Sequence, residues 1–249
     1  MGVLRSTVVK AVASTAATKL PGVVPGPVNT AVGKLVDIAI DGVRGVPGAK
    51  RVAAKALVRR RAVKPAIESV VRAHVRIATI SGAVTNIGGI VSEIVGTPAN
   101  LTGIIVIQLR MVACVAHLHG YDIDDPRVRT AITMCLLGEE ELARQIADGR
   151  LPSTPTAVAT ASIHDKALAS QVIDQVLRHL LIPTHGLLGL FARSVPILGG
   201  GLTGLDDWTA TKRVARCARI HFIPRRPIAG VTMVRLPAGS DSNPSLDAE

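Results

Sequence analysis

The stretch that decides the fold is residues 101–129, which reads LTGIIVIQLRMVACVAHLHGYDIDDPRVR. Apolar residues recur every three or four positions through its first two thirds, which is typical of a helix. Thr97 is a good N-cap and Pro98 suits the first helical position, so we expect a helix from there to His119. Gly120 fits its C-terminus. So long an apolar helix predicts a protein built around helices.

The end of the same stretch predicts a second helix. Asp124 or Asp125 is placed to cap it, Pro126 suits its first turn, and we expect it to run to Leu137. The rest of the chain has similar periodicity, and a strand pattern is suggested only at 228–236. Further helices are expected over 3–19, 28–43, 49–62, 64–95, 139–148, 162–182, 186–195 and 199–220, with a Pro- and Thr-rich connection at 151–160.

These elements predict an all-α fold, a compact bundle of glycine-rich helical hairpins with a flexible C-terminal tail. The two hairpins are expected at 77–119 and 179–220, where glycines would let helix backbones approach closely. Three parts are expected along the chain. They are an N-terminal helix and linker at 1–26, a helical domain at 27–222, and a loop-like, partly disordered tail at 223–249.

Composition narrows the class of protein. Of 249 residues, 48% are hydrophobic and 2% aromatic, so the chain can bury an aliphatic core and is not disordered throughout. Three cysteines, with no C-x-x-C pair, argue against a disulfide scaffold and a structural zinc site. His117 and His119 would point to different sides of a helix, which disfavours a shared ion. We expect no metal site and no cofactor.

The positive charge is concentrated near the N-terminus. The net charge is +11, and residues 1–76 carry 14 Lys and Arg against three acids. This asymmetry indicates a phosphate-rich partner, either an anionic lipid surface or nucleic acid, unless it is only a solvated helix face. The first 120 positions hold no aromatic residue to stack on bases, which favours lipid. Lipid or phosphate binding is expected from Lys50, Arg51, Lys55, Arg59, Arg60, Arg61, Lys64, Arg72 and Arg76.

The apolar segments are expected to stop short of crossing a membrane. The uncharged runs 77–92 and 94–109 are shorter than the about 20 apolar residues of a spanning helix. The apolar zone at 179–205 is interrupted by Arg193 and by two prolines. The N-terminus lacks the pattern of a secretory signal peptide. Each zone could form a helical hairpin, either in a core or pressed into a bilayer from one side.

Three elements of the 101–129 stretch form a pattern: Gln108-Leu109-Arg110, Gly120-Tyr121-Asp122 and Asp125-Pro126. A glycine-rich segment precedes it at 82–96, and a proline, glycines, Asp207 and Thr211 followed by basic residues close it. The whole resembles the EcsC protein family of bacteria over residues 45–222. The resemblance implies an α-helical, membrane-associated protein of the bacterial cytoplasm, with no settled reaction. The sequence departs from the family in the closing helix, at Asp206-Asp207-Trp208.

Polar residues within the region of resemblance form a second candidate site. Arg110 lies in an otherwise uncharged helix, where a charge needs a partner. An ion pair with Asp122, Asp207 or Glu93 is favoured over a guanidinium that binds a carboxylate or a lipid phosphate. Asp122 is expected mainly to fix the turn that follows the helix. The candidate polar site comprises Arg110, Tyr121, Asp122, Asp207 and Thr211.

Taken together, the sequence predicts a protein without catalysis that lies on the inner face of the plasma membrane. It would bind the anionic membrane surface or assist transport or secretion, and a membrane protein is a possible partner. The alternative is a membrane-proximal hydrolase of lipid or peptide that uses Arg110, Asp122 and Asp207. A weaker alternative is nucleic-acid binding by the basic segment 50–76. The sequence does not indicate whether the chain forms an oligomer.

Overall fold

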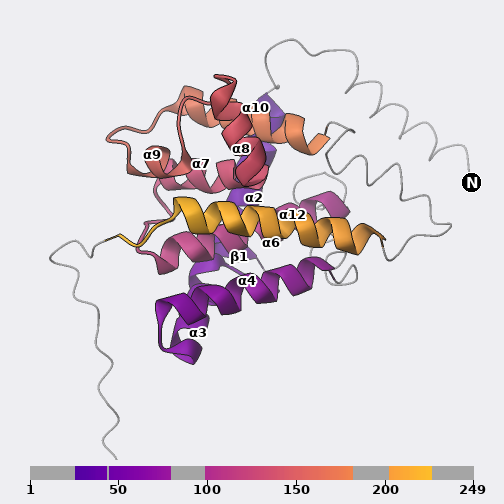
Figure 1. Ribbon diagram of the computed structural model, residues 1–249, viewed down its shortest axis with the longest axis vertical. Coiled ribbons are helices and arrows are strands. Elements are labelled where there is room, and N and C mark those ends of the chain that lie inside the picture. The colour runs from indigo at the N-terminus through magenta and orange to yellow at the C-terminus, as the bar shows by residue number, and fades with distance from the viewer. Residues whose placement is uncertain (1–25, 44, 80–98, 182–201, 226–249) are drawn as a thin grey trace, which may run out of the picture.

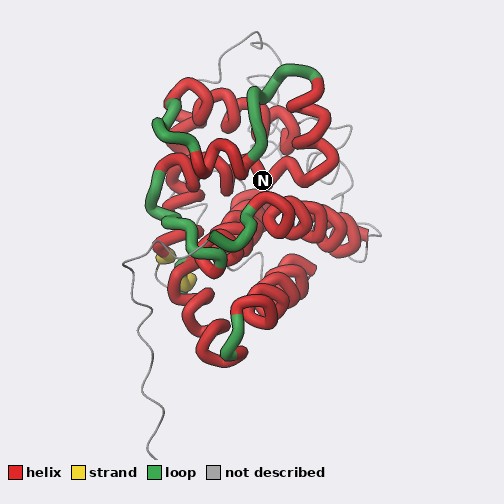
Figure 2. The backbone as a smooth tube through the Cα atoms, turned by 60° about the vertical axis from the view of Figure 1, so that its left-hand side comes forward, coloured by secondary structure: helices red, strands yellow, loops and turns green. Residues whose placement is uncertain are grey.

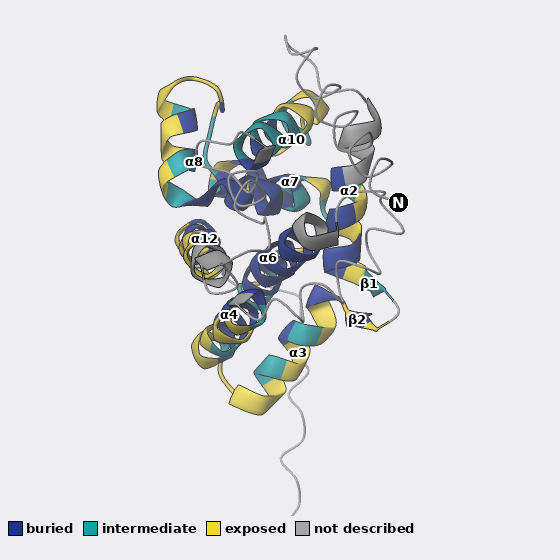
Figure 3. Ribbon diagram, turned by 90° about the vertical axis from the view of Figure 1, so that its right-hand side faces the viewer, coloured by how far each residue is buried: buried dark blue, intermediate teal, exposed yellow. Residues whose placement is uncertain are grey.

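The computed structural model describes residues 26–43, 45–79, 99–181 and 202–225. Helices make up most of this part, so the all-α prediction is confirmed (Figure 1). Figure 2 shows the same helices as a tube, joined by short loops and accompanied by one small hairpin of strands. The arrangement has three tiers, with α3 and α4 at one end, α6 and α12 in the middle, and α7 to α10 at the other end (Figure 1; Figure 3).

The described chain begins with α2 (Gly26–Asp41), close to the helix expected there. A hairpin of β1 (Gly42–Val43) and β2 (Val46–Pro47) follows, with Val43 opposite Val46. The sequence predicted only a break here, because strands of two residues are too short to show alternation. A Cβ atom added to Gly48 would lie 2.3 Å from the Ile40 carbonyl oxygen. The glycine therefore lets the chain pass close to the end of α2 before the next helix begins.

Two basic helices form the lower end of the molecule as drawn in Figure 1. They are α3 (Ala49–Arg60) and α4 (Val63–Thr79), and the predicted helix starts are confirmed within one residue. Arg61 ends α3 in the left-handed conformation, with φ 56°, and its N–H donates to the Leu57 carbonyl. The chain thus turns sharply, and the exposed cations of α3 lead directly into those of α4.

The central helix is α6 (Ala99–Leu118). Every residue from 103 to 116 is buried, and Figure 3 shows the helix dark blue along most of its length. Helices α2, α3, α4 and α12 all pack against it. It ends at Leu118, one residue before the predicted end, and the predicted glycine that follows, Gly120, has a φ of +86° that is easy for glycine and costly for other residues. The sequence stretch that suggested a helical fold therefore forms its core.

The upper tier begins with α7 (Pro126–Met134), which Asp125 caps by accepting a hydrogen bond from the Arg127 backbone N–H at 2.8 Å. The cap and the proline start are as predicted. Next come the 3-10 turn η1 (Cys135–Leu137) and the acidic helix α8 (Gly138–Ala147). The expected connection at 151–160 is partly wrong, because Thr154 caps a short helix, α9 (Pro155–Thr160). Helix α10 (Lys166–Leu181) completes the tier.

Helix α12 (Leu202–His221) lies beside α6 in the middle tier and packs against α4, α6 and α8. Residues 223–225 follow it without regular structure, and residues 226–249 of the predicted tail lie outside the described residues. The same holds for the helices expected at 3–19 and 186–195 and for the glycine-rich turns of both predicted hairpins. Among the helices that are described, none has the length and hydropathy needed to cross a membrane.

Candidate functional site

A groove of about 690 Å³ runs between α4 and α12. The two helices lie side by side and run in opposite directions (Figure 1). Apolar side chains of Val71, Val75 and Ala215 contribute to its lining. Most of the remaining described lining is cationic, with Glu68 as its single acid. The cations are Arg72, Arg76, Lys212, Arg216 and Arg219.

The α4 wall follows from helical spacing. Glu68, Arg72 and Arg76 are four residues apart, so they stand on one face of the helix, and all three are exposed. Val70 and His74, on the other side, are buried. The sequence therefore separates a basic face from an apolar face within one helix. Both arginines were predicted to bind lipid or phosphate, and the structure places them in the groove.

The α12 wall has the same construction. Trp208, Lys212 and Arg216 are four residues apart, and Ile220 continues the row. The Lys212 ammonium lies 3.5 Å from the centre of the Trp208 ring, in a cation–π contact. Trp208 is 37% exposed and Ile220 is 48% exposed, which is unusual for large apolar side chains beside so many charges. The groove therefore offers cations and apolar groups on the same surface.

The second wall was not among the residues predicted to bind lipid or phosphate. Residues 77–249 have no net charge, because acids elsewhere in this range balance the cations of α12. From Trp208 to Arg225 the chain carries Lys212, Arg213 and three further arginines and no acid. A count made helix by helix, together with the spacing of four, would have detected the row. The basic region of the folded protein is thus built from two distant parts of the sequence.

The remaining predicted cations lie on α3, at the α3–α4 corner and at the start of α4. All are exposed, and the ribbon in Figure 3 is largely yellow, the colour of exposed residues, at this corner. Lys50 forms an ion pair with Asp124, and that hydrogen bond raises the pKa of the Lys50 ammonium. The others have no ion pair with any residue that the structure describes. They are Arg51, Lys55, Arg59, Arg60, Arg61 and Lys64.

Arg110 occupies a different environment, because it is 4% exposed and faces α4 and the hairpin. Its Nε donates to His74 Nε2 and its Nη1 to the Pro47 carbonyl, each at 3.2 Å. The predicted ion pair with Asp122 is wrong. The other two proposed partners, Glu93 and the side chain of Asp207, lie outside the described residues. The described contacts of this guanidinium are therefore all with neutral groups.

Burial is the main cause of the shifted pKa values of Arg110 and its neighbours. Burial and the nearby guanidinium lower the pKa of His74 to about 4, so its imidazole is neutral at pH 7. The His74 Nδ1–H donates to the Val70 carbonyl at 2.8 Å, which leaves Nε2 free to accept from Arg110. Burial lowers the pKa of Arg110 and raises the pKa of the Cys114 thiol to about 12. These groups form a buried polar network that links α4, α6 and the hairpin.

The other members of the predicted polar site are dispersed. Tyr121 is 2% exposed and packs edge-to-face on Phe222, with ring centres 5.1 Å apart. Asp122 is exposed and accepts from the Asp124 backbone N–H at 3.0 Å, which is the predicted turn-fixing contact. Thr211 is fully buried, and its hydroxyl accepts from Gln108 Nε2 at 3.2 Å. The described side chains thus do not converge on one open pocket, so they do not supply the geometry that the hydrolase alternative needs.

One group of described side chains gathers closely enough to hold a metal ion. Glu139, Cys217 and His221 have ligand atoms that all lie within 4.8 Å of one another, where α8 meets α12. His117 and His119, the pair considered from the sequence, do not belong to this group. The His119 Nδ1 instead contacts the Phe222 carbonyl oxygen.

Comparison with known proteins gives a family and no closer relative. The model of the EcsC protein family matches residues 5–226, which is most of the chain, so the protein belongs to this family. The match extends beyond the predicted likeness at 45–222 and includes both walls of the groove. No curated protein and no solved structure matches the chain.

Proposed function

We propose that this member of the EcsC protein family binds the anionic surface of a membrane through the groove between α4 and α12. The observation that carries the proposal is the gathering of five cations, Trp208 and Ile220 on one surface. Each Lys or Arg near an anionic leaflet contributes about 1 kcal/mol of attraction, and salt screens it. Tryptophan favours the interface between water and lipid, where its ring is apolar and its N–H remains hydrated.

Lipid phosphate fits the groove better than a protein or a nucleic acid would. Five cations against one acid favour a ligand with several negative charges, and the apolar floor favours one that also has hydrocarbon. Trp208 is covered on one face by Lys212, so it is poorly placed to stack on a base. Exposed Val58 and Ile223 add isolated apolar groups beside the cations of α3 and after α12. The protein would therefore lie on the leaflet with α4 and α12 toward it.

Flotation with vesicles tests the proposal. The full chain should float with vesicles of phosphatidylglycerol and phosphatidylcholine, and stay at the bottom with phosphatidylcholine alone. Replacing two α4 cations, Arg72→Gln with Arg76→Gln, should weaken binding about 30-fold, from about 1 kcal/mol for each lost charge. Raising the salt concentration should weaken binding of the wild type more than that of the variant.

The matched control removes two exposed cations elsewhere, Lys34→Gln in α2 with Lys166→Gln in α10. These positions lie outside the groove lining, so this variant should bind within about threefold of the wild type, despite the same change in net charge. An equal loss of vesicle affinity in the groove variant and the control variant would show that binding depends only on net charge and would contradict the proposal. Tighter binding to duplex DNA than to the vesicles would contradict the lipid proposal and favour the nucleic-acid alternative.

A further inference from the structure

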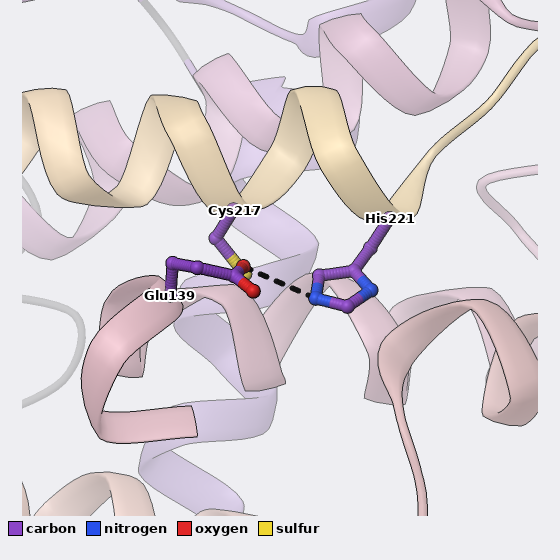
Figure 4. Close-up of side chains that lie close together, drawn as sticks. All are labelled: Glu139, Cys217 and His221. Atoms are coloured by element: carbon purple, nitrogen blue, oxygen red, sulfur yellow. Dashed lines mark ion pairs between the residues drawn. The ribbon is translucent and has the colours of Figure 1, made fainter. Parts of the chain in front are cut away.

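A second cluster lies on the other side of α12 from the groove, where it packs against α8 (Figure 4). Cys217 and His221 are four residues apart on α12, so both side chains leave the same face of the helix. Glu139 reaches toward them from the first turn of α8. Cys217 is fully buried and His221 is 9% exposed. The chain thus places a buried thiol and a buried imidazole beside a carboxylate whose side chain is 31% exposed.

The approach of the two helices is built into the backbone. Gly138, directly before Glu139, has φ +74°, a conformation that other residues rarely adopt. A Cβ atom at this position would lie 3.1 Å from the Cβ of Arg213 on α12. Glycine therefore allows α8 to begin against α12, and this contact brings the carboxylate to the cysteine and the histidine.

Two atoms of the cluster lack a hydrogen bond although they face each other. Glu139 Oε2 and His221 Nε2 are 3.2 Å apart, both are enclosed by protein, and neither has a hydrogen-bond partner. An ordinary ion pair at this distance would normally be made with the N–H directed at the carboxylate. Two ligands of one tetrahedral zinc ion, with bonds of about 2.0–2.1 Å, would lie about 3.3 Å apart. The separation observed is close to that of two ligands sharing an ion.

The hydrogen-bond partners of His221 favour the tautomer with the proton on Nδ1 and a free lone pair on Nε2. Thr156 Oγ1 lies 3.5 Å from the other ring nitrogen, Nδ1, and its own hydroxyl proton goes to the His221 carbonyl at 2.6 Å. The hydroxyl oxygen can therefore receive the Nδ1–H. Metal-binding histidines are commonly oriented in this way, by a partner on the nitrogen that does not bind the ion. In this tautomer, Nε2 directs a lone pair at the carboxylate.

We propose that Glu139, Cys217 and His221 bind a divalent zinc ion, with water as the fourth ligand. Thiolate, imidazole and carboxylate are the three side-chain types that zinc prefers. On binding, the Cys217 S–H bond breaks, its proton leaves to solvent, and the sulfur electron pair forms the bond to the ion. The site is distinct from the groove and does not rest on the proposed membrane binding.

Cys135 completes the surroundings of the site. It lies four residues before Glu139, and its thiol is hydrogen-bonded to Cys217. It would then donate to the Cys217 thiolate and stabilise the charge, as partners of metal ligands often do. No sequence pattern indicates this site, because its ligands follow no C-x-x-C spacing and come from separate regions of the chain.

Titration with Co²⁺ tests the site, because cobalt bound to a thiolate in a tetrahedral site absorbs visible and near-ultraviolet light. The reduced, metal-free full chain should bind one Co²⁺, develop the sulfur-to-cobalt band, and lose it when Zn²⁺ is added. Cys217→Ser should abolish the band, and His221→Gln should weaken binding at least tenfold. The matched control is Cys114→Ser, since Cys114 is equally buried but donates to the Ala49 carbonyl elsewhere; it should behave as the wild type.

The competing explanation is a simple ion pair between Glu139 and His221. That pair does not need Cys217, so a wild type that binds no Co²⁺, or a Cys217→Ser variant that keeps the band, would overturn the proposal. X-ray absorption of the zinc-loaded wild type gives a second measurement that needs no folded variant. It should show one sulfur at about 2.3 Å beside nitrogen and oxygen ligands at about 2.0–2.1 Å. A spectrum without sulfur would equally exclude the site.

Discussion

In both α4 and α12, one face of the helix lines the groove and the opposite face packs in the core. These two faces differ from each other more than α4 differs from α12. On the groove side, charged residues recur every fourth position and are exposed. On the core side, His74, Thr211 and Cys217 are buried within a few residues of those charges. Neighbouring residues in these two helices therefore serve different purposes. The stability of the fold should depend on the core face, and membrane binding should depend on the groove face. Substitutions at adjacent positions should therefore affect either stability or binding, but not both.

The largest expected effect is on stability, at the end of α12. Phe222 is fully buried and packs on Tyr121, so Phe222→Ala should lower the free energy of unfolding by about 4 kcal/mol. Ile220, two residues earlier, is 48% exposed in the groove, and Ile220→Ala should change it by less than about 0.5 kcal/mol. Denaturant unfolding measures both. Similar decreases in the free energy of unfolding for Phe222→Ala and Ile220→Ala would show that the core face and the groove face contribute equally to stability.

The second prediction uses pH to examine the core face of α4. Burial holds the pKa of His74 at about 4, below the value of about 6.5 expected in the unfolded chain. Between these values the unfolded chain takes up the proton first, so folding loses stability as the pH falls from 6.5 through 4. The loss from His74 approaches about 3 kcal/mol, from 1.36 kcal/mol for each pH unit of the difference.

His74→Gln provides the control, since glutamine does not titrate. Its free energy of unfolding should depend less on pH over this range, whatever its value at pH 7. Burial also lowers the pKa of His117 and His119, and their contribution remains in both proteins and cancels in the difference. Parallel curves for wild type and variant would show that His74 titrates normally in the folded protein.

Much of the fold could be predicted because its signals are local. The cap at Asp125, the proline after it and the glycine at 120 each act within a few residues, and the structure has all three. The hairpin after α2 was missed because Val43 and Val46 pair over too few residues to leave a pattern. Thr154 and Pro155 predicted a connection, although the same pair can start a short helix, as it does here.

The candidate sites were harder to predict, because they depend on which helices meet. Arg72 and Arg76 could be recognised as exposed cations, but nothing local shows that Lys212 and Arg216 stand across from them. A buried arginine suggests a carboxylate partner, whereas the fold places His74, from a helix earlier in the chain, beside Arg110. Packing, rather than any motif, brings these residues together.

The third prediction compares adjacent cations on the two sides of α12. Lys212 lines the groove and contacts Trp208, whereas the Cβ of Arg213 lies near Gly138 at the start of α8. Lys212→Gln should weaken binding to anionic vesicles about fivefold, from the loss of about 1 kcal/mol. Arg213→Gln should have less than a twofold effect, because it faces away and salt screens charges beyond about 10 Å.

Trp208 gives this comparison an independent measurement. It is the only tryptophan in the chain, so its fluorescence reports on the groove alone. Binding should shift the emission to the blue, and brominated lipids should quench it, in the wild type and in Arg213→Gln alike. Binding without any change in emission would place the membrane contact outside the groove and contradict the orientation proposed above.

The smallest effect is expected where a charge is both exposed and paired. Lys50 and Asp124 form an ion pair with about half of each side chain exposed to solvent, so water and salt weaken the attraction between them. Asp124→Asn should lower the free energy of unfolding by about 0.5 kcal/mol or less, and the difference should shrink at high salt. The same substitution releases Lys50, which lies on α3 among the other exposed cations. Asp124→Asn should therefore slightly strengthen vesicle binding while it slightly lowers the free energy of unfolding. A variant that is both less stable and weaker in vesicle binding would show that the ion pair positions α3 for binding.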